Sequence, residues 1–249
     1  LNLMAGIKAK RSTAYLAAAR YLAAAESLLP QDRWERSYEL TYEILFEKMK
    51  CEYMSGNFRE AEEIFRQLEN GARPGLDLCR ACNIMIMLNT SSGKNAAAVE
   101  YGFRALGNLG IRLPKRPSRM KIFAEMRVLN ARLRGKKAGT ITALPPMEDE
   151  VAKTACETLI NMVSPAYFSN SRLMASIVIT MVKLVLRRGN TDPSPMIFVS
   201  FAGLAGNLLG DHETAGAIAR GALKLADDQP AGKYRCKVHH IFALAVNHW

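Results

Sequence analysis

The sequence predicts an all-α protein, built as an antiparallel solenoid of helical hairpins with about eleven helices. Apolar residues recur at helical spacing, and no segment alternates as a β-strand does. Alanine fills runs such as 17–19 and 23–25, which favour helix and let neighbouring helices approach closely. With 49% hydrophobic and 23% charged residues, the composition is that of a folded protein with a large core.

The expected helices follow one another with mostly short connections, so sequential helices should pack as antiparallel neighbours. Asp32 and Glu35 have the spacing of a reciprocal capping box at a helix start, and Asn57 and Glu60 repeat it. The expected ranges are 1–29, 33–55, 57–70, 74–91, 94–109, 118–134, 148–163, 169–188, 195–209, 212–227 and 231–249.

Residues 135–147 are the one long connection, and they contain Pro145 and Pro146. We therefore expect a linker here, with N-terminal hairpins at 1–134 and C-terminal hairpins of the same solenoid at 148–249. The first residues read as the middle of a helix and lack the layout of a signal peptide, so we expect a piece of a longer protein. We expect no membrane insertion, because the most apolar stretch, 173–186, is too short for a bilayer and contains a lysine.

Three predicted hairpin turns share a pattern, in which a glycine precedes an alanine by five residues. The pairs are Gly56 with Ala61, Gly93 with Ala98, and Gly210 with Ala215. The glycine can end one helix in the left-handed conformation, and the alanine presents a small side chain to the partner helix. The first two turns are 37 residues apart, near the period of a tetratricopeptide repeat, which predicts a tetratricopeptide-like fold.

Several short segments add a closer resemblance. They are KAKRSTAY at 8–15, LLP at 28–30, Trp34 with YEL at 38–40, CEYMSGNF at 51–58, LGIRLP at 109–114, LPPM at 144–147, MVKL at 181–184, RGN at 188–190 and HW at 248–249. Together they are similar to the tetratricopeptide-like region of very large signalling proteins. Those proteins join a serine/threonine-kinase-like domain, a predicted AAA-type ATPase, this region, a GAF domain and often a histidine kinase.

The resemblance covers essentially the whole chain, and it implies a non-catalytic interaction or sensory module of a cytoplasmic signal-transduction protein. ATP binding and phosphotransfer would belong to other domains of the full-length protein. We therefore expect no catalytic residue, no cofactor and no metal in this segment. Its partners would be other domains of the same chain, or proteins and peptides. A stand-alone protein-binding scaffold and a basic nucleic-acid-binding repeat are the alternatives.

The five cysteines are odd in number and scattered through apolar helical surroundings, which is typical of reduced thiols in a cytosolic protein. Cys79 and Cys82 form a C-x-x-C pair, and Cys236 and His239 form a C-x-x-H pair, so the four could in principle bind zinc. Their separation in a stacked array favours buried or partly exposed thiols instead. His239, His240 and His248 are interpreted as polar positions rather than catalytic groups.

Two further clusters have both a chemical and a packing interpretation. Gly203, Gly206 and Gly210 lack the spacing of either nucleotide-binding loop, so helix packing is preferred. Asp211, followed by His212 and Glu213, could suggest acid–base chemistry, but a helix cap is preferred because a helix is expected to start there.

The basic segment at 111–139 is the strongest functional candidate, with ten Lys and Arg residues against one Glu. It could form a solvated face, dock a protein or domain, or bind nucleic acid or phospholipid. Nucleic-acid-binding modules usually interleave aromatic residues with their cations, and this segment contains only Phe123, so nucleic acid or phospholipid is the least favoured of the three. The expected partner-binding residues are Arg112, Lys115, Arg116, Arg119, Arg132, Arg134, Lys136 and Lys137. Further candidate contacts, for each of which core packing is the favoured interpretation, are Tyr15, Tyr21, Trp34 and Tyr38.

Overall fold

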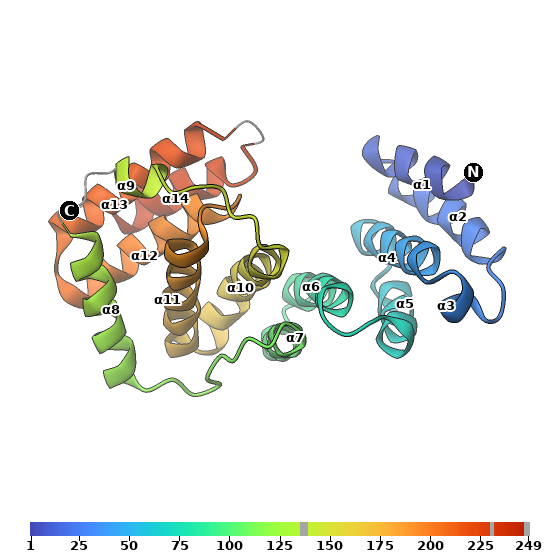
Figure 1. Ribbon diagram of the computed structural model, residues 1–249, viewed down its shortest axis with the longest axis horizontal. Coiled ribbons are helices and arrows are strands. Elements are labelled where there is room, and N and C mark those ends of the chain that lie inside the picture. Colours follow the sequence, from blue (N-terminus) through green and yellow to red (C-terminus); the bar gives the residue numbers. More distant parts are fainter. Residues whose placement is uncertain (135–138, 230–231, 247–249) are drawn as a thin grey trace. The chain divides into compact units, whose positions relative to one another are not determined.

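The computed structural model describes residues 1–134, 139–229 and 232–246, and within these ranges the chain is helical with no β-strand. The all-α prediction is therefore confirmed. The chain divides into two compact units, Leu1–Ile111 and Arg112–Trp249 (Figure 1). Each unit has its own core, and each is described by itself below.

The first unit is a succession of helical hairpins. Within it α1 packs on α2, α2 on α4, α4 on α5, α5 on α6 and α6 on α7. Its core gathers apolar side chains from α4 to α7, while a smaller cluster joins the first hairpin to Cys51 of α4. The helices are α1 (Asn2–Arg11), α2 (Tyr15–Glu26), α3 (Arg33–Arg36), α4 (Tyr38–Met54), α5 (Phe58–Gly71), α6 (Leu76–Ser91) and α7 (Asn95–Asn108).

The second unit contains two hairpins, α10 with α11 and α12 with α13, onto which the other helices pack. Helix α14 contacts α12 and α13, and α8 lies against α11, α12 and α13. The helices are α8 (Arg119–Leu133), α9 (Gly139–Thr142), α10 (Glu150–Ser169), α11 (Ser171–Arg188), α12 (Ser194–Leu209), α13 (His212–Asp227) and α14 (Arg235–Ala245).

Three predicted helices differ from those observed. The helix expected at 1–29 is broken between α1 and α2, and the one at 33–55 is broken at Ser37. The helix expected at 148–163 continues through Pro165 to Ser169 as α10. Asp32 and Asn57 do precede helices as predicted, but neither side chain makes the capping hydrogen bond; Asn57 donates to Glu52 instead.

The glycine turns have the predicted geometry. Gly56, Gly93 and Gly210 have φ of 80°, 71° and 68°, in the left-handed region. After α4 the N–H of Gly56 donates to the Tyr53 carbonyl and the next N–H donates five residues back, and the same pair of bonds closes α6 at Gly93. This pattern is the Schellman motif, whereas Gly210 makes the simpler single bond to Gly206.

The break between α1 and α2 is a further copy of this turn, with threonine in place of glycine. Thr13 has φ of 59°, its N–H donates to the Lys10 carbonyl, and the N–H of Ala14 donates to Ala9. Ala18 lies five residues after Thr13 and is fully buried, as are Ala61, Ala98 and Ala215 in the other hairpins. The repeat therefore occurs once more than the glycines indicate.

Thr13 should be replaceable by glycine with a gain in stability. A β-branched residue with positive φ is strained, and glycine is not, although glycine also adds entropy to the unfolded chain. We expect Thr13→Gly to raise the free energy of unfolding by about 0.5–1 kcal/mol in urea titrations. The reverse change, Gly93→Thr, should lower it by about 1–2 kcal/mol. A loss of stability in Thr13→Gly would contradict the turn assignment.

The expected linker at 135–147 is not where the units divide. Residues 135–138 lie outside the described ranges, but α9 packs on α13, and Ile141 and Met147 are buried. The Met147 N–H donates to the Asn190 carbonyl (2.6 Å), and the Asn190 N–H donates to Pro145 (2.7 Å). The LPPM and RGN segments are thus joined. The division falls between Ile111 and Arg112 instead, so α8 belongs to the second unit.

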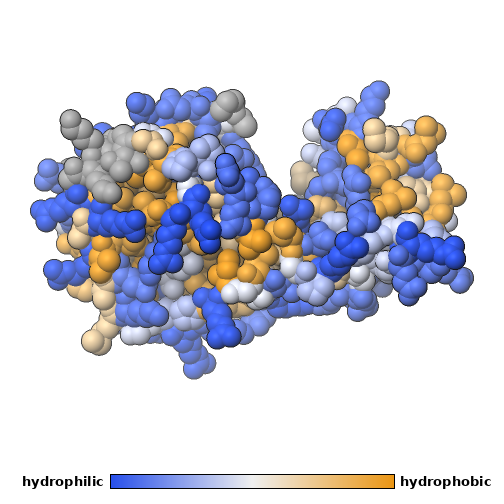
Figure 2. Space-filling model, viewed as in Figure 1, coloured by the Kyte–Doolittle hydropathy of each residue, from blue (hydrophilic) through white to orange (hydrophobic). Residues whose placement is uncertain are grey.

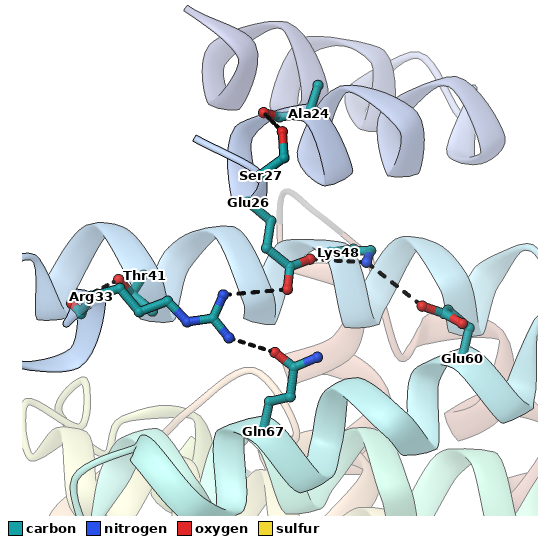
Figure 3. Close-up of polar contacts among 8 residues, drawn as sticks. All are labelled: Ala24, Glu26, Ser27, Arg33, Thr41, Lys48, Glu60 and Gln67. Atoms are coloured by element: carbon teal, nitrogen blue, oxygen red, sulfur yellow. Dashed lines mark hydrogen bonds and ion pairs between the residues drawn. The ribbon is translucent and has the colours of Figure 1, made fainter. Parts of the chain in front are cut away.

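Charged side chains connect the first hairpin to the helices that follow it (Figure 3). Lys48 of α4 lies 3.0 Å from a Glu26 carboxylate oxygen of α2 and 3.6 Å from Glu60 of α5. Arg33 lies 3.5 Å from the other Glu26 oxygen and donates to Gln67 at 2.8 Å. The side chains of Lys48 and Glu26 are only 11% and 17% exposed, so solvent screens their attraction less than at an open surface.

Candidate interaction surface

The predicted partner-binding residues all belong to the second unit. Arg112, Lys115 and Arg116 lie on the segment before α8, and the other described members lie on α8 or directly after it. Every described member is exposed, whereas Lys136 and Lys137 lie outside the described residues. The described members are Arg112, Lys115, Arg116, Arg119, Arg132 and Arg134.

The charge of the chain is divided very unevenly between the two units. The first unit has 14 Lys and Arg against 13 Asp and Glu, and the second has 20 against 10. Almost all of the net charge of +11 therefore belongs to the second unit. The predicted basic segment supplies most of this excess, and cations on α10, α11, α13 and α14 add to it.

Helix α8 holds part of the basic segment against the second unit. Its residues Ile122, Met126, Leu129 and Leu133 follow one helical stripe and are buried. An ion pair of 3.0 Å between Lys183 and Glu125 joins α11 to the same helix. Arg119, Arg127 and Arg132 of the same helix are exposed to solvent.

A polar hollow lies between α8 and the start of α13, lined in part by Arg127, Arg134 and Asp211. Asn130 donates to the Asp211 carboxylate at 2.7 Å, and the Thr214 N–H donates to it at 3.1 Å. Burial raises the pKa of Asp211, but these hydrogen bonds and the charge of Arg134 outweigh it and leave the pKa below its usual range. The carboxylate stays charged, so this hollow already contains an anion beside its arginines. Asp211 also caps α13, as predicted.

An apolar hollow of about 780 Å³ opens elsewhere on the second unit, between α10, α12 and α14. Its lining includes Tyr167 and Phe168, which are 63% and 72% exposed, and Leu244, which is 66% exposed. A smaller apolar hollow of about 380 Å³ beside α8 shares Met174 and Leu204 with it. We call the two together the apolar groove.

Sequence reasoning did not find the apolar groove, because its residues come from five helices, α8, α10, α11, α12 and α14, that are spread over the second half of the chain. The one local signal is the adjacent pair Tyr167 and Phe168, two large aromatic residues side by side near a helix end. Their rings meet edge to face, with ring centroids 5.2 Å apart.

Figure 2 shows hydrophilic and apolar residues together on the surface. Apolar side chains also gather at the α1–α2 end of the first unit.

Two of the four candidate aromatic contacts belong to the core of the first unit. Tyr38 is buried, donates to Asp77 at 2.8 Å and accepts from the Arg73 N–H at 2.6 Å. Trp34 covers Gly71 so closely that a β-carbon there would lie 2.0 Å from the indole ring. Tyr15 is partly exposed, and Tyr21 is 48% exposed.

The cysteine pairs lie in different units. Cys79 and Cys82 are buried in α6 of the first unit, whereas Cys236 is exposed on α14 with His239, whose ring lies 3.2 Å from Asp227. Among the described residues, no His, Cys, Asp or Glu side chains form a group of three or more that could hold a metal ion. Gly203 packs against α14, where a β-carbon would lie 3.0 Å from that of Ala245.

The cysteines should differ sharply in reactivity. Burial raises the pKa of Cys51 to about 11, and that of Cys82 and Cys156 to about 12. Cys79 is buried as well, which leaves Cys236 as the exposed thiol among the five. We expect a disulfide reagent at pH 8 to label one thiol quickly in the native protein and the other four only in urea. Persistence of the fast reaction in Cys236→Ser would contradict this assignment.

Within the described ranges, no helix combines the length and apolarity needed to cross a bilayer. Comparison with protein-family models, with curated proteins and with solved structures finds no match.

Proposed function

We propose that the chain is a non-catalytic, tetratricopeptide-like interaction module. The support is the recurrence of one hairpin design, with a positive-φ residue, a buried alanine five residues later and a small or apolar buried residue seven beyond that. The last positions are Ala25, Leu68, Ala105 and Ala222. Such hairpins stack into solenoids, whose surfaces serve mainly to bind other proteins.

The resemblance of the short sequence segments supports the further proposal that this module belongs to a multidomain signal-transduction protein. In this proposal the attached serine/threonine-kinase-like, AAA-type ATPase, GAF and histidine-kinase domains carry the ATP-dependent chemistry. The helical module receives a partner and transmits its binding to them. Its own partners are proteins, peptides or the neighbouring domains.

The observation that carries the proposal is the surface of the second unit. An open apolar groove is unusual on a surface that faces only water, since large exposed apolar patches mark interaction sites. Here it lies in the unit that carries nearly all the net positive charge. Apolar contact would supply affinity, and the charge would select and attract the partner.

A selection of peptides displayed on phage tests the proposal. We expect the immobilised chain to enrich peptides, and the triple variant Arg112→Glu, Arg116→Glu and Arg119→Glu to bind them roughly tenfold more weakly. All three arginines are exposed, so their reversal should leave the fold intact. Binding is measured by titration with each enriched peptide.

The matched control reverses three exposed cations of the first unit, in Arg20→Glu, Arg59→Glu and Lys94→Glu. This variant should retain binding. Equal losses in both variants, or the absence of any enriched peptide, would contradict the proposed function. Hydrolysis of ATP by the chain alone would also contradict it.

The excess charge of the second unit favours one other candidate, a nucleic-acid-binding repeat. That function requires affinity for RNA or DNA which falls steeply as salt rises, because bound cations release counterions from the phosphates. Retention of single-stranded RNA on filters at low salt, lost in the arginine triple variant, would support this candidate instead.

A further inference from the structure

We propose that the apolar groove binds an acidic amphipathic helix of a partner protein or domain. This inference rests on the proposed interaction function and specifies the chemistry of its ligand. It is carried by the shape of the groove and by the charges around it.

The larger hollow of the groove is lined by stripes of residues along α10, α12 and α14. On α12 the lining residues run from Met196 to Asn207, which corresponds to about 16 Å along a helix axis. On α10 they run from Ile160 to Phe168, and on α14 from Lys237 to Ala245, each about two turns. A trough of this length matches about three turns of a bound helix, whose apolar residues would enter it at i, i+3, i+4 and i+7.

The side chains of the groove suit aliphatic anchors. Met174 and Met196 are flexible and polarisable, and methionine recurs in grooves that accept helices of varied sequence. Leu204, Ile241 and Leu244 add branched apolar surface. A platform for nucleobases would instead depend on flat aromatic faces spaced along a basic channel.

The charge around the groove selects an acidic partner. The cations among the described lining residues are Arg119, Arg172 and Lys237, and no Asp or Glu lines the groove. Two carboxylates outside the lining, Glu157 and Asp192, lie close enough to the lining residue Tyr234 to raise its pKa. A helix with one apolar face and glutamates beside it would bury its apolar face in the groove and bring its glutamates to these cations. The attraction between the opposite charges would also raise the association rate at low salt.

A designed peptide tests the inference on the full chain. The probe is a fluorescent peptide of about 14 residues, with leucine along one helical face and glutamate on the other. We expect binding by fluorescence anisotropy, weakened at least about tenfold by the double variant Phe168→Ser with Leu244→Ser. Lys237→Glu should weaken it most at low salt.

Val128→Ser is the matched control, because Val128 is 68% exposed on α8 and outside the groove lining. It should change affinity less than about twofold. The same peptide with lysine in place of glutamate should not bind. Urea titrations of each variant show whether the fold is kept, which separates lost contacts from unfolding.

Three results would overturn the inference. The first is an acidic peptide that does not bind, or binds equally well to the double variant. The second is binding of oligo-uridine that Phe168→Ser with Leu244→Ser abolishes, which would make the groove a nucleic-acid site. The third is self-association that the same variant abolishes, since the groove would then hold a second copy. If one of these results is obtained while displayed peptides still bind elsewhere on the chain, this inference fails and the proposed function stands.

Discussion

The close approach of helices across short left-handed turns is the constraint on which this structure depends. In four hairpins, α1–α2, α4–α5, α6–α7 and α12–α13, the chain reverses within a few residues at one residue with positive φ, and the next helix lies tightly against the last. Ala18, Ala61, Ala98 and Ala215 allow this close approach, and each is fully buried. In the second unit the turn at Gly210 joins α12 to α13, and α12 lines the apolar groove.

Much of this design is visible in the sequence, because glycine reports positive φ directly. Gly56, Gly93 and Gly210 therefore located three hairpins. The turn at Thr13 was missed because the chain there takes the same conformation with a residue that normally avoids it. The boundary at 135–147 was wrongly placed for a related reason. Proline suggested a linker, but backbone pairing between Pro145 and Asn190 holds it to the second unit.

The candidate surface was only half predictable. A run of cations is a local pattern, so the basic segment could be found, and its described members are all exposed. The apolar groove depends on which faces of α10, α12 and α14 remain uncovered after packing. Periodicity shows that Ile160, Leu204 or Ile241 are apolar, but not whether another helix covers them. Only the arrangement of helices places the groove in the charged unit.

Overpacking tests the central constraint most directly. Ala98 is buried in α7, which packs on α6, whereas Ala96 is exposed on the same helix. In urea titrations, Ala98→Leu should lower the free energy of unfolding by about 2 kcal/mol or more, because the hairpin has no room for the larger side chain. Ala96→Leu should change it by less than about 0.5 kcal/mol. Equal, small effects of the two substitutions would contradict the account.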